Sequence, residues 1–149
     1  MLIPTKKGQY ALRAVYELAK RQGSGPTKIS AIAAAQAIPH RFLEVILYHL
    51  KSSGLVTSTR GFYGGYQLTR PAAEITVGEI LRHVHKEMAE AECLACISVR
   101  NCPFAGGCAF SSLWQRVKTA VFKVYDDTTL QDLLDDKEAA KVLDPRCAV

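Results

Sequence analysis

Apolar residues recur at helical spacing through the first fifty positions. From residue 9 to 21 they fall three and four apart, until Gly23 to Pro26 breaks the pattern. Ser30 is a predicted N-cap for a short Ala-rich helix that ends near Gln36, and a turn is expected at 37–39. A third helix carries five apolar residues on one predicted face: Phe42, Leu43, Ile46, Leu47 and Leu50. Two helices joined by a short turn predict a helix-turn-helix.

Beyond Gly54 the pattern changes to that of β-strands. Residues 55–59 form a strand-like run rich in β-branched side chains, 66–69 form a second alternating run, and the segment between them is rich in glycine. This predicts a β-hairpin. A helix-turn-helix followed by a hairpin is the winged-helix arrangement, in which the second helix of the pair enters the major groove of DNA.

The second half of the chain predicts further helices around a loop. Thr76 and Glu79 have capping-box spacing and open a fourth helix, residues 93–108 are expected to form a loop, and a capping pattern at Thr128 to Gln131 opens a short last helix. A long helix over about 112–126 has an apolar surface wider than one small core covers, which predicts a dimer seam. The residues assigned to this seam are Leu113, Val117, Val121 and Val124.

The fold class predicted from these elements is mainly α, a winged helix-turn-helix with a small β-hairpin wing and a long dimerisation helix. We divide the chain into a DNA-binding unit, residues 1–75, and a unit of loop and dimerisation helices, residues 76–149. The chain has 149 residues, 48% of them hydrophobic, which is enough for a buried core. With no signal peptide and no apolar run long enough to span a membrane, a soluble cytoplasmic protein is expected.

The net charge of +5 is unevenly distributed. Residues 1–75 carry ten Lys and Arg against three Asp and Glu, whereas residues 76–149 carry nine against eleven. A basic first half favours a polyanionic partner, and double-stranded DNA fits the predicted fold.

Particular side chains are candidates for DNA contacts. Arg41 suits guanine, Glu44 suits the amino group of cytosine, and Arg60 at the hairpin tip suits a narrow minor groove. Lys28, Lys51 and Arg70 are expected at phosphates, and His40, Tyr48 and Tyr63 complete the predicted set. Each residue taken alone fits a solvated surface better than a DNA contact, and only the ordered set of helix, turn, helix and basic hairpin reverses this in favour of DNA binding.

Four of the five cysteines fall within 16 residues of one another. Cys96, Cys102 and Cys108 are equally spaced, and Cys93 is the nearest further thiol. Thiolates on a loop with glycines are the ligands that an iron-sulfur cluster takes, either 2Fe-2S or 4Fe-4S. Structural zinc is the main rival, although the spacing lacks two CxxC pairs, and buried or idle thiols are the third alternative. Cys147 is not expected to be a ligand.

Several segments resemble one known family, and together they span nearly the whole chain. They are Tyr10 to Ala14, Phe42 to Glu44, the run from Gly54 to Leu68 with its Arg-Gly-x-x-Gly-Gly-Tyr hairpin, Thr76 to Ile80, and Thr128 to Leu134. These are similar to the Rrf2 family of bacterial winged-helix transcription regulators. The resemblance implies a homodimer on a partly palindromic operator, with many members sensing iron, nitric oxide or redox state through an iron-sulfur cluster.

The chain departs from the family at the fourth cluster ligand. Some relatives supply a histidine where this chain has Ser111, and others supply an acidic residue near the position of Gln9. Cys93 is therefore our first choice for the fourth ligand, ahead of an oxygen from Gln9 or Ser111. His83 and His85 are expected to be ordinary surface or packing residues.

The predicted function is that of a transcription regulator, such as a repressor, whose operator affinity depends on the cluster. A cluster-containing redox or electron-transfer protein and a zinc-stabilised adaptor are the alternatives. No nucleotide-binding loop or catalytic constellation accompanies the cysteines, so an enzyme is not expected.

Overall fold

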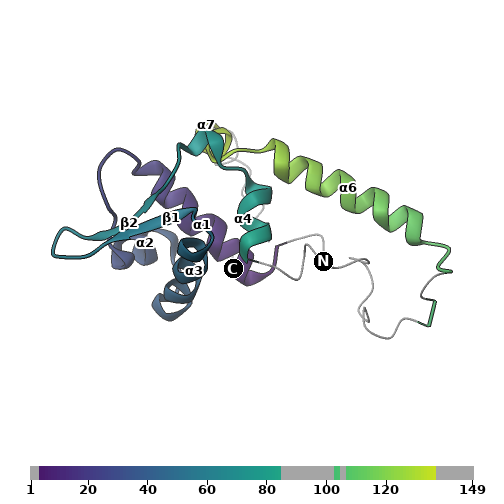
Figure 1. Ribbon diagram of the computed structural model, residues 1–149, viewed down its shortest axis with the longest axis horizontal. Coiled ribbons are helices and arrows are strands. Elements are labelled where there is room, and N and C mark those ends of the chain that lie inside the picture. Colours follow the sequence, from purple (N-terminus) through teal and green to yellow (C-terminus); the bar gives the residue numbers. More distant parts are fainter. Residues whose placement is uncertain (1–3, 85–102, 105–106, 137–149) are drawn as a thin grey trace.

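The computed structural model describes residues 4–84, 103–104 and 107–136, and its element order confirms the predicted fold class (Figure 1). It contains α1 (Lys6–Lys20), α2 (Ile29–Gln36), α3 (His40–Ser52), β1 (Val56–Thr59), β2 (Gly65–Leu68), the 3-10 turn η1 (Ala72–Glu74), α4 (Val77–Val84), α6 (Ser111–Asp127) and α7 (Leu130–Asp135). The described part is mostly helical, with a two-stranded antiparallel hairpin as its wing.

The first three helices pack around one apolar core. The apolar stripe predicted for α1 is buried through Ala11, Ala14, Val15 and Leu18, and α3 contributes Leu43, Ile46, Leu47 and Leu50. Burial of several large aliphatic side chains, each worth roughly 1.5–3 kcal/mol, is the main force that joins these helices.

Two local expectations for this region are wrong. Ser30 does not cap α2, because the helix already begins at Ile29 with Lys28 as its N-cap and no side-chain cap bond. The carbonyl of Lys28 accepts from the N–H groups of Ala31 and Ile32, which places Ser30 inside the first turn. Phe42 is not buried in the core: it is 60% exposed, and its ring lies 6.2 Å from that of Tyr10.

The wing is joined to the start of α2 by backbone hydrogen bonds. Thr59 pairs with Gly65 at the tip of the two strands, and Thr27 exchanges two 2.8 Å hydrogen bonds with Tyr66. A Cβ on Gly65 would lie 2.4 Å from the Thr27 carbonyl oxygen, and one on Gly64 would lie 2.2 Å from that of Thr59. The Gly-Gly pair is therefore required for the close approach of three chain segments.

Helices α4 and α7 return to the same core. Ile80, Val84 and Leu130 belong to the core cluster of α1 and α3, so this core includes residues on both sides of position 75. The predicted start of α4 is confirmed, because the N–H of Glu79 donates to the Thr76 hydroxyl at 3.2 Å. Isolated antiparallel pairing of Thr76 with Thr129 holds the starts of α4 and α7 side by side.

The last capping pattern was predicted one residue too early. Thr129, not Thr128, caps α7, and its capping box is closed by Asp132. The hydroxyl of Thr128 instead donates to the carbonyl of Val124 in α6. The hydrogen bonds from Thr129 lower the pKa of the Asp132 carboxyl, so the box is complete at neutral pH.

Candidate nucleic-acid interface

The outer face of α3 is a mixed polar and aromatic surface. Arg41, Glu44 and Tyr48 are all exposed on it, opposite the buried leucines and Ile46. Tyr48 is 69% exposed, which is unusual for an aromatic residue without a partner surface. One oxygen of Glu44 lies 3.5 Å from Nδ1 of His40, so these two predicted contacts adjoin one another near the helix N-terminus.

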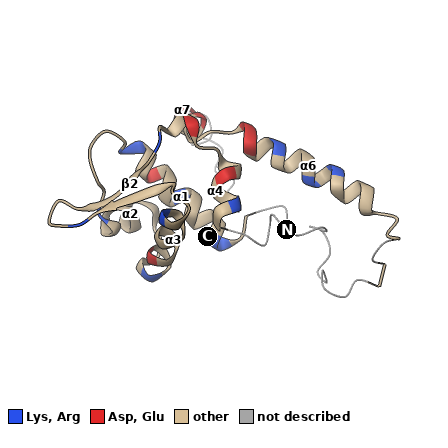
Figure 2. Ribbon diagram, in the orientation of Figure 1, with Lys and Arg blue, Asp and Glu red and all other residues tan. Residues whose placement is uncertain are grey.

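The wing extends from the body beside α2 (Figure 2). Arg60, Phe62 and Tyr63 are exposed at its tip, and the ammonium of Lys28 lies 4.8 Å from the centre of the Phe62 ring. Between Glu44 and Glu74 the chain carries no acidic residue. The described surface thus carries basic side chains both on α3 and at the tip of the wing and has little negative charge, as phosphate binding requires.

Two of the basic residues assigned to phosphates have partners within the chain. The ammonium of Lys51 donates to the Ser58 hydroxyl at 2.6 Å, which joins α3 to β1 while leaving Lys51 exposed. The guanidinium of Arg70 pairs with the Glu79 carboxylate at 2.5 Å and donates to the carbonyl of Glu74. Arg70 therefore connects the end of the wing to α4. The same pair explains why Glu79 does not complete a capping box with Thr76.

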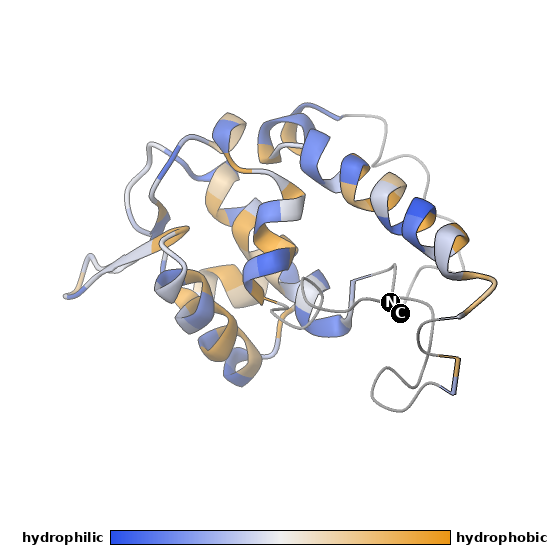
Figure 3. Ribbon diagram, turned by 45° about the vertical axis from the view of Figure 1, so that its right-hand side comes forward, coloured by the Kyte–Doolittle hydropathy of each residue, from blue (hydrophilic) through white to orange (hydrophobic). Residues whose placement is uncertain are grey.

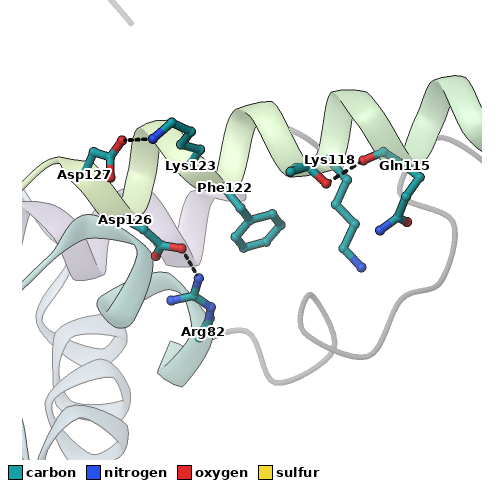
Figure 4. A pocket seen from close by; sticks show the side chains of 8 residues that line it. Arg82, Gln115, Lys118, Phe122, Lys123, Asp126 and Asp127 are labelled. Carbon is teal, nitrogen blue, oxygen red and sulfur yellow. Dashed lines mark hydrogen bonds and ion pairs between the residues drawn. The ribbon is translucent and has the colours of Figure 1, made fainter.

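The end of α6 is joined to α4 at a close contact (Figure 4). Arg82 of α4 forms an ion pair with Asp126 and lies 5.5 Å from the ring of Phe122. A Cβ on Gly78 would lie 1.9 Å from the Asp126 carboxylate, so an alanine there would require the Asp126 side chain to shift. Beside the contact is an open cavity of about 550 Å³, lined by Arg82, Gln115, Lys118, Thr119, Phe122, Lys123, Asp126 and Asp127.

No residue of α6 is buried within one chain, although hydrophobic positions recur along the helix (Figure 3). Of the four predicted seam residues, Leu113 and Val124 are exposed, whereas Val117 and Val121 are partly buried. The structure thus confirms the long helix and leaves its apolar surface largely accessible. The dimer seam itself stays a prediction.

Cys108 is the one predicted cluster ligand that lies among the described residues. It is partly buried and precedes α6, and its carbonyl accepts from the N–H of Ser111 at 3.1 Å. Cys93, Cys96, Cys102, Cys147 and His85 lie outside the described residues, and His83 is exposed on α4. Gln9, considered as a fourth ligand, is exposed on α1 and donates to the carbonyl of Pro4. Within the described ranges, no group of three metal-binding side chains comes together.

Glu17 is an important residue that the sequence analysis missed. Its side chain is only 3% exposed and accepts from Nε of Arg21 at 2.6 Å and from Nε2 of Gln36 at 2.8 Å. Burial by itself raises the pKa of Glu17, but the bonds from Gln36 and Arg21, together with Lys20, outweigh it and leave the pKa lowered. The carboxylate holds the end of α2 against α1. The sequence feature that could have revealed Glu17 is an acidic residue on the apolar side of the helix, four residues before an arginine.

Comparison with known proteins gives consistent matches over most of the chain. The family model described as "Rrf2: Iron-dependent Transcriptional regulator" matches residues 4–136. The HTH-type transcriptional regulator CymR of Bacillus subtilis is 38% identical over 127 residues, which is 85% of this chain and 86% of that protein.

Two solved structures of similar regulators superpose well on this chain. A structure of T. potens IscR has a TM-score of 0.73 at 34% identity and covers 93% of this chain and 90% of its own. A structure of CymR, the global cysteine regulator of B. subtilis, has a TM-score of 0.74 at 36% identity and covers 91% of this chain and 98% of its own. Among the described residues, no helix is long and apolar enough to cross a membrane.

Proposed function

Because this chain belongs to the Rrf2 family of transcriptional regulators, we propose that it binds an operator in double-stranded DNA as a homodimer, under the control of its cysteine loop. Its relatives are regulators and not enzymes. The observation that carries the proposal is the surface formed by α3 and the wing, where Arg41, Tyr48 and Arg60 are exposed beside a buried apolar core.

In this docking α3 lies in the major groove. Arg41 reads guanine and Glu44 reads cytosine, with His40 and Tyr48 beside them. Arg60 enters the minor groove, and Lys28, Lys51 and Tyr63 contact the backbone or groove walls. Arg70 is left out of this set, because its charge is already paired with Glu79.

The homodimer is proposed to form through α6. An exposed helix with recurring apolar residues leaves unfavourable surface in water, and a second copy covers it symmetrically. Leu113, Val117, Val121 and Val124 are the proposed contacts. Pairing two winged helices in this way presents two copies of α3 to successive major grooves of a palindromic operator.

The proposed cofactor is an iron-sulfur cluster held by Cys96, Cys102 and Cys108, with Cys93 as the fourth ligand. The donor set fits the group, since four thiols lie within 16 residues and Cys108 is partly accessible beside the start of α6. When bound, such a cluster supplies a centre that iron supply, nitric oxide or oxidants alter. Cys108 leads directly into α6, so a change in how this residue is held moves the helix.

A related possibility is control by the thiols themselves. It is favoured by the similarity to CymR of Staphylococcus aureus, 34% identical to this chain, for which an oxidized form has been solved. In that case oxidation or modification of the four cysteines alters the loop without a metal. The two forms of control predict different colours and different iron contents for the purified protein.

DNA binding is tested by selecting duplexes from a random library and measuring affinity against salt concentration. We expect a partly palindromic sequence and a steep salt dependence. Arg41→Ala should relax preference at one base pair at a cost of roughly 1–3 kcal/mol, whereas Arg60→Ala should weaken binding most at narrow A-T tracts. If both variants bind as tightly as wild type at the same salt, the docking is wrong.

The cofactor is tested by anaerobic purification, absorption spectroscopy and analysis of iron, sulfide and zinc. A brown, sulfide-containing protein supports the cluster, whereas a colourless protein whose DNA affinity follows thiol oxidation supports thiol control. Bound zinc without sulfide supports the adaptor, and colour without duplex binding supports a redox protein. Single Cys→Ser variants assign the ligands: those at 96, 102 and 108 should lose the cluster, that at 93 should hold a less stable one, and that at 147 should behave as wild type.

A further inference from the structure

The tip of the wing carries two aromatic residues that the described fold does not use. Phe62 is 79% exposed and Tyr63 is 87% exposed, the largest values among the exposed large hydrophobic residues of the described chain. The turn itself depends on the glycines at 64 and 65, where a Cβ would collide with backbone. Nothing comparable requires aromatic rings at 62 and 63, so their presence calls for a partner outside this chain.

The two rings form an ordered pair. Their centroids are 5.0 Å apart and their planes lie at 86°, an edge-to-face contact. The ammonium of Lys28 lies 4.8 Å from the centre of the Phe62 ring, a cation–π contact between the start of α2 and the wing. A continuous set of contacts thus runs from the body through Phe62 to Tyr63, which holds the outermost ring in place before binding.

The charge around the pair identifies the kind of partner. Arg60 precedes it by two residues, Lys28 contacts it from α2, and no acidic residue lies between positions 45 and 73. An apolar tip flanked by cations complements a surface that is anionic at its edges and apolar inside. The minor groove of DNA has this character, with phosphates along both walls and stacked bases between them. An apolar groove on a protein would not require the flanking cations.

We propose that Phe62 and Tyr63 form a wedge that enters the minor groove beside Arg60, partly unstacks one base step and bends the operator. This rests on the proposed DNA-binding function and adds to it a deformation of the DNA. Apolar side chains inserted in this way kink duplexes by about 20–90° toward the major groove. Since pyrimidine–purine steps unstack most easily, such a step is expected under each wing.

The test uses the full-length protein and its selected operator. The bend angle is measured by fluorescence energy transfer between labelled duplex ends, and unstacking by 2-aminopurine placed at the step under the wing. Wild type should bend the operator and raise the 2-aminopurine fluorescence. Tyr63→Ala should lose most of both signals and bind about tenfold more weakly, which corresponds to ~1.4 kcal/mol.

Two further variants separate wedging from other effects. Tyr63→Leu keeps an apolar side chain of similar reach and should retain most of the bend. Phe62→Ala removes the support and should give an intermediate bend. A mismatch at the step removes most of the unstacking cost, so it should strengthen binding of wild type more than binding of Tyr63→Ala. Both rings are exposed, so urea unfolding curves of the variants should match wild type.

The outcomes are distinguishable. If wild type binds the selected operator without bending it, or Tyr63→Ala bends it equally, the wedge is refuted while DNA binding stands. An unchanged bend together with loss of a protein partner by Tyr63→Ala also refutes the wedge and assigns the tip to protein docking. If wild type binds no duplex in a salt-dependent way, the proposed function itself fails.

Discussion

Replacing Glu17 tests whether a buried carboxylate fixes the helix-turn-helix. In Glu17→Ala the Gln36 amide loses its acceptor at a half-buried site and the charge-assisted bond from Arg21 is lost. A hydrogen bond to a charged group contributes roughly 1.5–3 kcal/mol, but Arg21 is partly exposed and recovers water. The hydrogen bond from Gln36 is therefore expected to contribute its full free energy to stability, and the bond from Arg21 only a small part of its own. The expected loss is about 2–4 kcal/mol of unfolding free energy, and Glu17→Gln should cost about half as much because it keeps one acceptor.

The pKa of Glu17 gives this prediction a pH dependence. A lowered pKa means that the folded state favours the ionised carboxylate, so the contribution is complete above the pKa of an unfolded glutamate, about 4.3. It is lost as pH falls through the lower pKa of the folded state. The stability difference between wild type and Glu17→Gln, which cannot titrate, should thus be largest at pH 7 and shrink below about pH 4.

Urea unfolding followed by circular dichroism at pH 7 and at lower pH measures both effects. Glu44→Ala is the matched control, because Glu44 is exposed and its pairing with His40 should contribute no more than about 1 kcal/mol. If Glu17→Ala unfolds at the same urea concentration as Glu44→Ala, the carboxylate does not hold α2 to α1. A difference between wild type and Glu17→Gln that is constant with pH would contradict the ionised state.

Three further substitutions test other parts of the structure. Ala37 ends α2 with φ 50°, so Ala37→Gly should raise the unfolding free energy by about 1 kcal/mol, and a lower urea midpoint would contradict this strain. Val121→Asp should weaken the proposed dimer by at least about 3 kcal/mol, because pairing would bury an uncompensated charge. A variant that still sediments as a dimer at micromolar concentration excludes this seam. Gly78→Ala should lower the unfolding free energy by about 1 kcal/mol more in wild type than in an Asp126→Ala background, because the added Cβ clashes with the Asp126 carboxylate. If the two effects are additive in urea unfolding, the contact is refuted.

Patterns that depend on neighbouring residues could be predicted from the sequence. The stripes of α1 and α3 and the Gly-Gly wing are local and strongly marked, because burial repeats every three to four residues in a helix and sharp turns require glycine. Together with the apolar positions recurring over 113–124, they place α3, the wing and the long α6 within a few residues of their observed bounds.

What the sequence did not predict depends on partners far along the chain. Glu17 meets Gln36 across 19 positions, and Arg70 meets Glu79 across nine. Phe42 has the spacing of a core residue, yet it lies at the margin of the stripe, where it faces Tyr10 and solvent. For Glu17 and Phe42 the competing choices are equally compatible with helical periodicity, and only the packing of a second element decides between them.

The proposed control by the cysteine loop requires a path to the DNA-binding helices, and the fold restricts that path. Cys108 lies before one end of α6, whereas the contact with Gly78 and Arg82 lies at the other end. A helix of 17 residues is about 25 Å long. This exceeds the screening length of about 8 Å at physiological salt, so charge at Cys108 has little direct influence on the contact at Gly78 and Arg82.

The remaining path from Cys108 to α4 is mechanical, through the helix α6 itself. Directly after the C-terminal end of α6, two backbone hydrogen bonds of 2.9 Å join the chain to the start of α4. The Val77 N–H donates to the Thr128 carbonyl, and the Leu130 N–H donates to the Ile75 carbonyl. These bonds leave little freedom between α6 and the start of α4, so a tilt of α6 is passed to α4 and through the shared core to α1 and α3. Removing the ion pair with Asp126→Ala should accordingly weaken the effect of the loop on operator affinity while leaving the thiols and the DNA contacts intact. Equal dependence on loop state in Asp126→Ala and wild type would show that the signal does not need the ion pair between Asp126 and Arg82.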